Sequence, residues 1–95
     1  MINFVICDDN LNILDRFSKM LENIFIKNNY EATIGLTTNN ENELLNYIDD
    51  VKTDVVILDI NLKSNKTGLE IASLIREKNK NIYIIFTTAH LEYAM

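Results

Sequence analysis

The sequence predicts a single α/β domain built on a parallel β-sheet with helices on both faces. Short apolar runs alternate along the chain with longer stretches whose apolar residues recur at helical spacing, which is the order of successive βαβ units. A chain of 95 residues accommodates one domain of modest core size. Its content of 47% hydrophobic and 24% charged residues lies within the range of ordinary globular chains and favours neither disorder nor a membrane protein.

The first strand and helix are expected in the first 30 residues. Residues 2–7 form an apolar run in which only Asn3 is polar, as in a strand buried on both faces. From Leu11 onward the pattern changes to helical spacing, and Asn28 and Asn29 end it. The apolar stripe of this amphipathic helix consists of Leu14, Phe17, Leu21, Ile24 and Phe25.

A second strand and helix follow. Residues 31–38 carry β-favouring side chains in a weakly alternating row, which indicates a strand at the edge of the sheet. Asn40, with Glu43 three residues later, has the pattern of a capping box at the start of a helix that ends near Asp50.

The clearest β signal is the run 55–58, a central strand that leads directly into Asp59. Thr67 is expected to cap the next helix, with Glu70 reaching back and Gly68 in the first turn. Its predicted apolar face consists of Leu69, Ile71, Ala72, Leu74 and Ile75. A fourth strand over 82–86 then delivers Thr87, Thr88 and Ala89 at its carboxyl end.

Charge and composition exclude several function classes. The net charge is −5 and the nine basic residues are scattered, so we expect no nucleic-acid footprint in this segment. No apolar run is long enough to span a membrane and the start lacks the basic flank of a signal peptide, so we expect a cytoplasmic location. The lone cysteine, Cys7, is interpreted as a small buried thiol.

Three carboxylates are expected at one edge of this sheet. Asp8 and Asp9 follow the first strand and Asp59 closes the third, and pairing of those strands would bring all three together. Like charges at such short range require a cation, and oxygen ligands without nearby His or Cys select Mg²⁺. A carboxylate beside Mg²⁺ can accept a phosphoryl group, which makes Asp59 the candidate nucleophile. The alternative is that these residues only form turns at strand ends.

Four segments together resemble the receiver domains of two-component response regulators, and the match spans nearly the whole chain. The segments are Ile-Cys-Asp-Asp (6–9), Val-Val-Ile-Leu-Asp-Ile-Asn-Leu (55–62), Thr-Gly-Leu-Glu-Ile-Ala (67–72) and Ile-Ile-Phe-Thr-Thr-Ala-His (84–90). The loop from Asp59 to Gly68 and the Thr-Ala-His ending look most like regulators of the LytTR or accessory-gene-regulator type. The resemblance implies a flavodoxin-like doubly wound fold with strand order 2-1-3-4.

The resemblance also implies a role for each site residue. Asp9 and Asp59 would bind Mg²⁺ directly, Asp8 through water, and Asn61 through its backbone carbonyl. Asp59 would take phosphate from a sensor histidine kinase, and Thr88 would sense the phosphate and swing inward. The domain would then act as a switch, not as a metabolic enzyme, and control a transcription output domain that binds DNA.

The chain departs from the family at its end. Receivers have a fifth strand, a last helix and a lysine that pairs with the phosphoryl group. Residues 1–95 contain none of these features, so we expect an incomplete receiver domain. Loss of the lysine should slow phosphoryl transfer. The strand 82–86 would lie unpaired at an edge, which predicts a homodimer or a strand-exchanged oligomer.

Two other functions remain open at this point. A phosphorylation-independent interaction or dimerisation domain would keep the fold without the chemistry. A phosphatase of the aspartyl-phosphate type would need a second acid two residues after the nucleophile, where this chain has Asn61. The single histidine, His90, is interpreted as an exposed loop residue because no partner for a metal or general-base role is evident.

Overall fold

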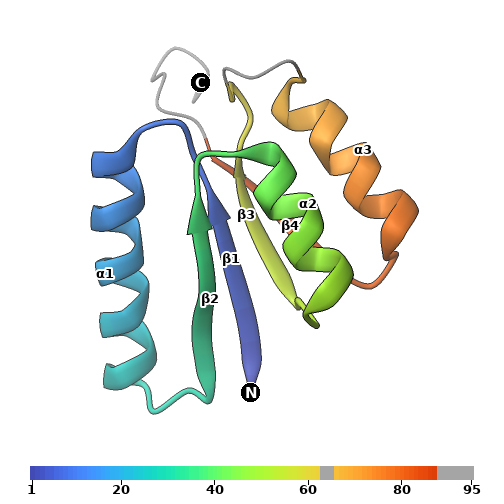
Figure 1. Cartoon of the computed structure of the whole chain (residues 1–95). Helices are drawn as coiled ribbons and strands as arrows, with labels where there is room; N and C mark the ends of the chain where they lie inside the picture. The colour runs from blue at the N-terminus through green and yellow to red at the C-terminus, as the bar shows by residue number, and fades with distance from the viewer. Residues whose placement is uncertain (63–65, 88–95) are drawn as a thin grey trace.

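The computed structural model describes residues 1–62 and 66–87. Four strands alternate with three helices in this part of the chain (Figure 1). In order they are β1 (Ile2–Cys7), α1 (Leu11–Lys27), β2 (Ala32–Thr38), α2 (Glu41–Asp50), β3 (Val55–Asp59), α3 (Gly68–Lys78) and β4 (Tyr83–Thr87). Every predicted element is present, with ends that differ by one residue or two. None of the described helices is long and apolar enough to cross a membrane.

The strands form one parallel sheet in the order β2-β1-β3-β4, which confirms the predicted order. Helix α1 covers one face, whereas α2 and α3 lie side by side on the other (Figure 1). Strand β2 is at an edge, as its weak alternation predicted. Strand β4 forms the other edge of the described sheet, and three of its side chains are exposed, namely Tyr83, Ile85 and Phe86.

The core has two layers because each central strand buries both of its faces. All five residues of β3 are buried, and so is the second half of β1. On the side of α2 and α3, Cys7 and Leu58 pack with Leu44 and Ile71, whereas Ile6 and Ile57 belong to the layer under α1. Continuous apolar runs are the expected sequence of strands buried in this way.

The inward stripe of α3 contains Ile71, Ala72 and Ile75 as predicted, whereas Leu74 is only half-buried and the start of the stripe differs. Gly68, Ile71, Ala72 and Ile75 are buried, in the spacing i, i+3, i+4 and i+7 that keeps one face of a helix inward. Leu69 is exposed, so its predicted place on the apolar face was wrong. The stripe begins one residue earlier, at a glycine, which a pattern of apolar side chains does not detect.

Polar side chains cap the helices next to the carboxyl edge of the sheet. The side chain of Asn40 accepts a hydrogen bond from Glu43 N at 3.0 Å, which confirms it as the cap of α2. Thr67 and Glu70 form the predicted capping box of α3. Asn10 caps α1 in the same way, by accepting from the backbone N–H groups of residues 12 and 13. These caps fix where each helix leaves the loops that surround the candidate site.

Candidate functional site

The carboxyl ends of β1 and β3 bring the predicted acidic residues together. The two strands pair in parallel with Cys7 opposite Leu58, so Asp8 and Asp59 follow at the same edge of the sheet. Only 7% of Asp8 and 8% of Asp59 is exposed, and Asp9 is half-buried. This edge is where open parallel sheets bind ligands.

Both buried carboxylates are held by their own loops. Asp8 Oδ1 accepts a hydrogen bond from Asn10 N at 2.9 Å, and Asp59 Oδ1 accepts one from Asn61 N at 3.0 Å. Each is a turn in which an aspartate bonds the backbone two residues on. The neighbouring strands are bonded to these loops as well, because Asp8 N donates to Thr38 O at 3.1 Å and Ile60 N donates to Thr87 O at 2.9 Å.

The site has an excess of negative charge. Burial raises the pKa of Asp8 above its ordinary value, the charges of Asp59 and Asp9 raise it further, and the hydrogen bond from Asn10 opposes the rise. Burial also raises the pKa of the Cys7 thiol to about 12, with smaller contributions from nearby carboxylates. Cys7 is therefore a protonated core residue, as predicted.

The three predicted aspartates are oxygen donors of the type that a hard divalent cation prefers. Asp8, Asp9 and Asp59 offer carboxylate oxygens, and a cation would relieve the repulsion that raises the pKa of Asp8. Among residues 1–62 and 66–87, however, no group of three or more Asp, Glu, His or Cys side chains could hold a metal ion, so the expected cluster of three carboxylates is not formed there. Mg²⁺ normally binds through one or two carboxylates and keeps several waters, so a partial protein ligand set suits it. The predicted ligand roles of these residues and of the Asn61 carbonyl stay predictions.

Gly68 was predicted in the first turn of α3, but its contact with the backbone of Asp59 was not predicted. A Cβ atom at this position would lie 2.3 Å from the Asp59 carbonyl oxygen and 2.8 Å from Ile60 Cα. The start of α3 therefore packs directly on the backbone at the end of β3, an approach that only glycine allows. The Thr-Gly pair at the start of the helix could have indicated this contact, because glycine often allows two backbones to approach closely.

Two residues discussed from the sequence lie outside the described residues. Thr88, the predicted phosphate-sensing residue, directly follows β4, and His90 lies two positions further on. Thr87, at the end of β4, pairs in register with Asp59. The described part of β4 therefore runs to the acidic edge, next to Asp59.

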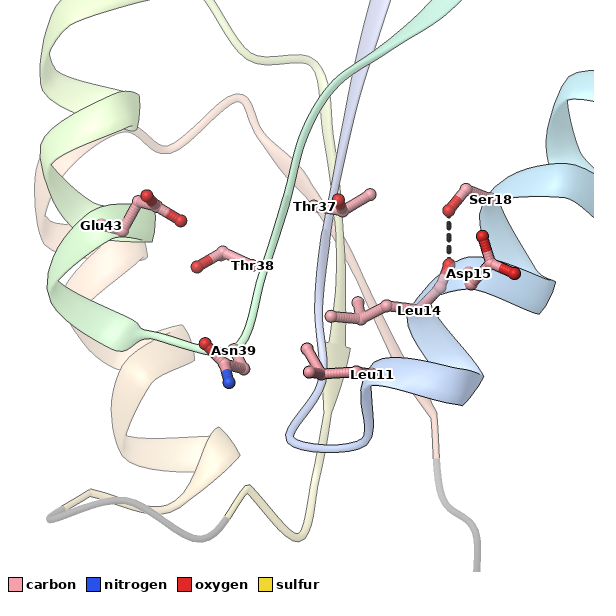
Figure 2. A pocket seen from close by; sticks show the side chains of 8 residues that line it. All are labelled: Leu11, Leu14, Asp15, Ser18, Thr37, Thr38, Asn39 and Glu43. Carbon is pink, nitrogen blue, oxygen red and sulfur yellow. Dashed lines mark hydrogen bonds between the residues drawn. The ribbon is translucent and has the colours of Figure 1, made fainter.

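A pocket lies between the start of α1 and the connection from β2 to α2 (Figure 2). Figure 2 shows Leu11 and Leu14 on the α1 side, opposite Thr38 and Asn39. Within α1, Ser18 donates a hydrogen bond to the Leu14 carbonyl. The three central acidic residues do not line this pocket, so it is a separate feature of the same edge.

Comparison with known proteins agrees with this geometry. Residues 4–95 match the family model described as the response regulator receiver domain. The positive alginate biosynthesis regulatory protein of Pseudomonas aeruginosa is 31% identical over 94 residues, which cover 99% of this chain and 36% of that protein. The chain thus spans about a third of this curated relative.

Solved structures with the same fold include complexes. The response regulator protein TrrA from Thermotoga maritima, solved with Mg²⁺ and BeF, is 32% identical with a TM-score of 0.79, over 98% of this chain and 74% of that one. TrrA was also solved in complex with the histidine kinase ThkA. The matched chain of that complex is 31% identical to this chain with a TM-score of 0.76, and the match covers 94% of this chain and 70% of the matched chain. The Salmonella typhimurium response regulator RcsB shares 23% identity and a TM-score of 0.78, over 94% of this chain and 42% of that one.

Proposed function

Because the chain belongs to the response regulator receiver domain family, we propose that it is a phosphoryl-accepting switch of a two-component system, with Asp59 as the acceptor. Receiver domains are signalling domains, and this one has relatives among transcription regulators. The observation that carries the proposal is the placement of Asp59 and Asp8 at the ends of paired central strands, where both are almost fully buried.

The chemistry proposed is attack by a carboxylate oxygen of Asp59 on phosphorus. The bond from phosphorus to the donor breaks, and the donor, a phosphohistidine of a sensor kinase, leaves as imidazole and takes up a proton. Bound Mg²⁺, which we assign to Asp8, Asp9, Asp59 and the Asn61 carbonyl, supplies positive charge beside the transferring oxygens. The turn at Asn61 holds one oxygen of Asp59 in place.

A sensor histidine kinase is the proposed donor, and the support is that the related TrrA was solved bound to one. We assign the sensing role to Thr88 because β4 runs in register to Asp59 at the preceding residue. The output is proposed to be transcription control by a DNA-binding domain, in a regulator of the LytTR type that works in the cytoplasm. The 31% identical relative is a positive regulatory protein of alginate biosynthesis, which supports a regulatory output.

Intact-mass analysis tests the acceptor directly. The chain is incubated with acetyl phosphate and Mg²⁺, and one added phosphoryl group is expected. Asp59→Asn should abolish the adduct, whereas Asp50→Asn, an exposed acid at the end of α2, should leave it unchanged. A folded wild-type chain that binds Mg²⁺ but takes no phosphoryl group would refute the proposal.

The exposed side chains of β4 favour a second function, association with another copy that is independent of phosphorylation. Tyr83 is 73% exposed and Ile85 50%, on the edge strand of the described sheet. Such an edge offers unpaired backbone groups and apolar side chains to another strand. Sedimentation velocity at increasing concentration should show dimers both with and without phosphodonor, and Ile85→Lys should reduce them. A monomer at every concentration excludes this second function.

A further inference from the structure

The edge strand β2 has a pocket on one face and a groove on the other. The α1 pocket is the one drawn in Figure 2, with a volume of about 290 Å³ between α1 and the end of β2. The α2 groove is more open, has a volume of about 770 Å³, and is lined by residues of α2 together with Leu36 of β2. Asn39 and Glu43 line both, so the pocket and the groove meet at the turn from β2 to α2.

Every charged side chain that lines the pocket and the groove is acidic. Asp15 and Glu43 line the α1 pocket, Glu43 and Asp50 line the α2 groove, and none of the described Lys or Arg residues lines either. Lys19 binds Asp15 at 3.0 Å, but both side chains are exposed and such a pair contributes little. Glu43 and Asp50 form no ion pair within residues 1–62 and 66–87. The charge around the end of β2 therefore favours a positively charged occupant.

The pocket and the groove also have apolar walls that suit a long side chain. In Figure 2, Leu11 and the buried Leu14 form the α1 side of the pocket. In the α2 groove, the half-buried Leu36 and Tyr47 have the same place. Lys and Arg side chains pack their aliphatic stems on apolar surface and keep the charged end in a polar environment. One such side chain therefore fits each of the two sites in shape and in charge.

The backbone between the two sites offers a strand edge. Strand β2 pairs only with β1 in the described sheet, and after an irregularity between Phe4 and Val5 the pairing is regular over residues 36–38. The other side of an edge strand carries unpaired backbone groups, to which an extended segment can add. Successive side chains of an extended segment point to opposite faces of the sheet. Two consecutive residues would thus reach the α1 pocket and the α2 groove.

We propose that the end of β2 binds an extended basic segment of another protein, in which two consecutive Lys or Arg side chains enter the α1 pocket and the α2 groove. Glu43, which lines both, accepts hydrogen bonds from both side chains. A second copy of this chain does not suit the site, because its net charge is −5 and no two basic residues are consecutive in its 95 residues. The proposal makes no use of Asp8 or Asp59 and is independent of phosphoryl transfer.

Fluorescence polarisation with a labelled peptide tests this surface. The probe is the fluorescein-labelled peptide Thr-Val-Arg-Arg-Val-Thr, titrated with the full chain at low salt. Wild type should bind the probe, and Glu43→Gln should bind it about 10-fold more weakly, the loss expected for one hydrogen bond to a charged group. Glu77→Gln removes an exposed charge from α3 and should match wild type. Circular dichroism checks that both variants fold.

The order of residues in the peptide tests the alternation between the two faces. The peptide Thr-Arg-Val-Arg-Val-Thr has the same composition but places both arginines on one face of an extended segment. It should bind about 3-fold more weakly, because one exposed ion pair is lost. In nuclear magnetic resonance spectra of the wild-type chain, the first peptide should shift the amide signals of residues 36–39.

Several results would overturn the proposal. These are the absence of binding at millimolar chain, equal affinity of wild type and Glu43→Gln, and amide shifts confined to other segments. Equal weakening in Glu43→Gln and Glu77→Gln, or equal binding of the two peptides, would show attraction by overall charge alone. Concentration-dependent sedimentation of wild type that Glu43→Gln abolishes would instead assign the surface to a second copy of the chain.

Discussion

The sharpest prediction concerns Gly68, because β3 and α3 approach each other there through backbone atoms. In Gly68→Ala, the new methyl group would lie 2.3 Å from the Asp59 carbonyl oxygen, against a practical minimum of 3.0 Å, so the backbones must separate by at least 0.7 Å. Overpacking of this kind costs about 1–3 kcal/mol. Alanine recovers about 0.5–1 kcal/mol of helix propensity, so a net loss of about 1–2 kcal/mol is expected.

Urea unfolding followed by circular dichroism measures this loss. Ser73→Ala, at an exposed position in the same helix, is the matched control and should stay within about 0.5 kcal/mol of wild type. Because the separation also moves the turn in which Asn61 N bonds Asp59, the Asn61 amide resonance should shift in Gly68→Ala and not in the control. A Gly68→Ala chain as stable as wild type would show that the close approach of α3 to β3 is not a real constraint.

Three further predictions concern titration and capping. Because the pKa of Asp8 is raised in the folded state, Asp8 contributes stability below its ordinary pKa of 3.8, and this stability is lost as the pH rises through the folded pKa. Without metal, Asp8→Asn should therefore be more stable than wild type at pH 7 and equally stable at pH 3. A stability difference that does not change with pH would contradict this prediction. Cys7 should resist iodoacetamide at pH 8 in the folded chain and react fully in urea, by intact mass; rapid labelling of the folded chain would argue against burial. Thr67→Ala should cost about 1 kcal/mol in urea unfolding, and Thr67→Ser should recover most of it; two equal losses would show that the capping oxygen contributes nothing.

The sequence predicted the order of elements well because the central strands and the helix caps carry strong local signals. The run Val55 to Leu58 is apolar on both faces, and the structure buries all of it. Asn40 and Thr67 were found from residue types at fixed offsets, and both cap helices as expected. The pairing of β1 with β3 places Asp8 and Asp59 at one edge of the sheet, as expected, but the expected cluster of three carboxylates is not found among the described residues.

Features that depend on contacts between distant segments were not accessible from one sequence. The exposure of Leu69 follows from the inward position of Gly68, which depends on how α3 meets β3. The sequence shows Glu41 only as an acid at a helix start, whereas the structure buries its Oε2 atom without a hydrogen-bond partner among the described residues. The left-handed Asn29, with φ of 55°, ends α1, and the sequence pattern showed only that the helix stops there.

Because the strands are buried to different extents, their backbone amides should exchange hydrogen with solvent at different rates. Strand β3 and the second half of β1, which carry Asp59 and Asp8 at their ends, are buried on both faces and should keep their hydrogens until the whole domain opens. Strand β4 is exposed or half-buried at every residue and should exchange through small local openings. The acidic groups thus stand on the backbone that should exchange most slowly, while the neighbouring strand that ends beside them should exchange sooner.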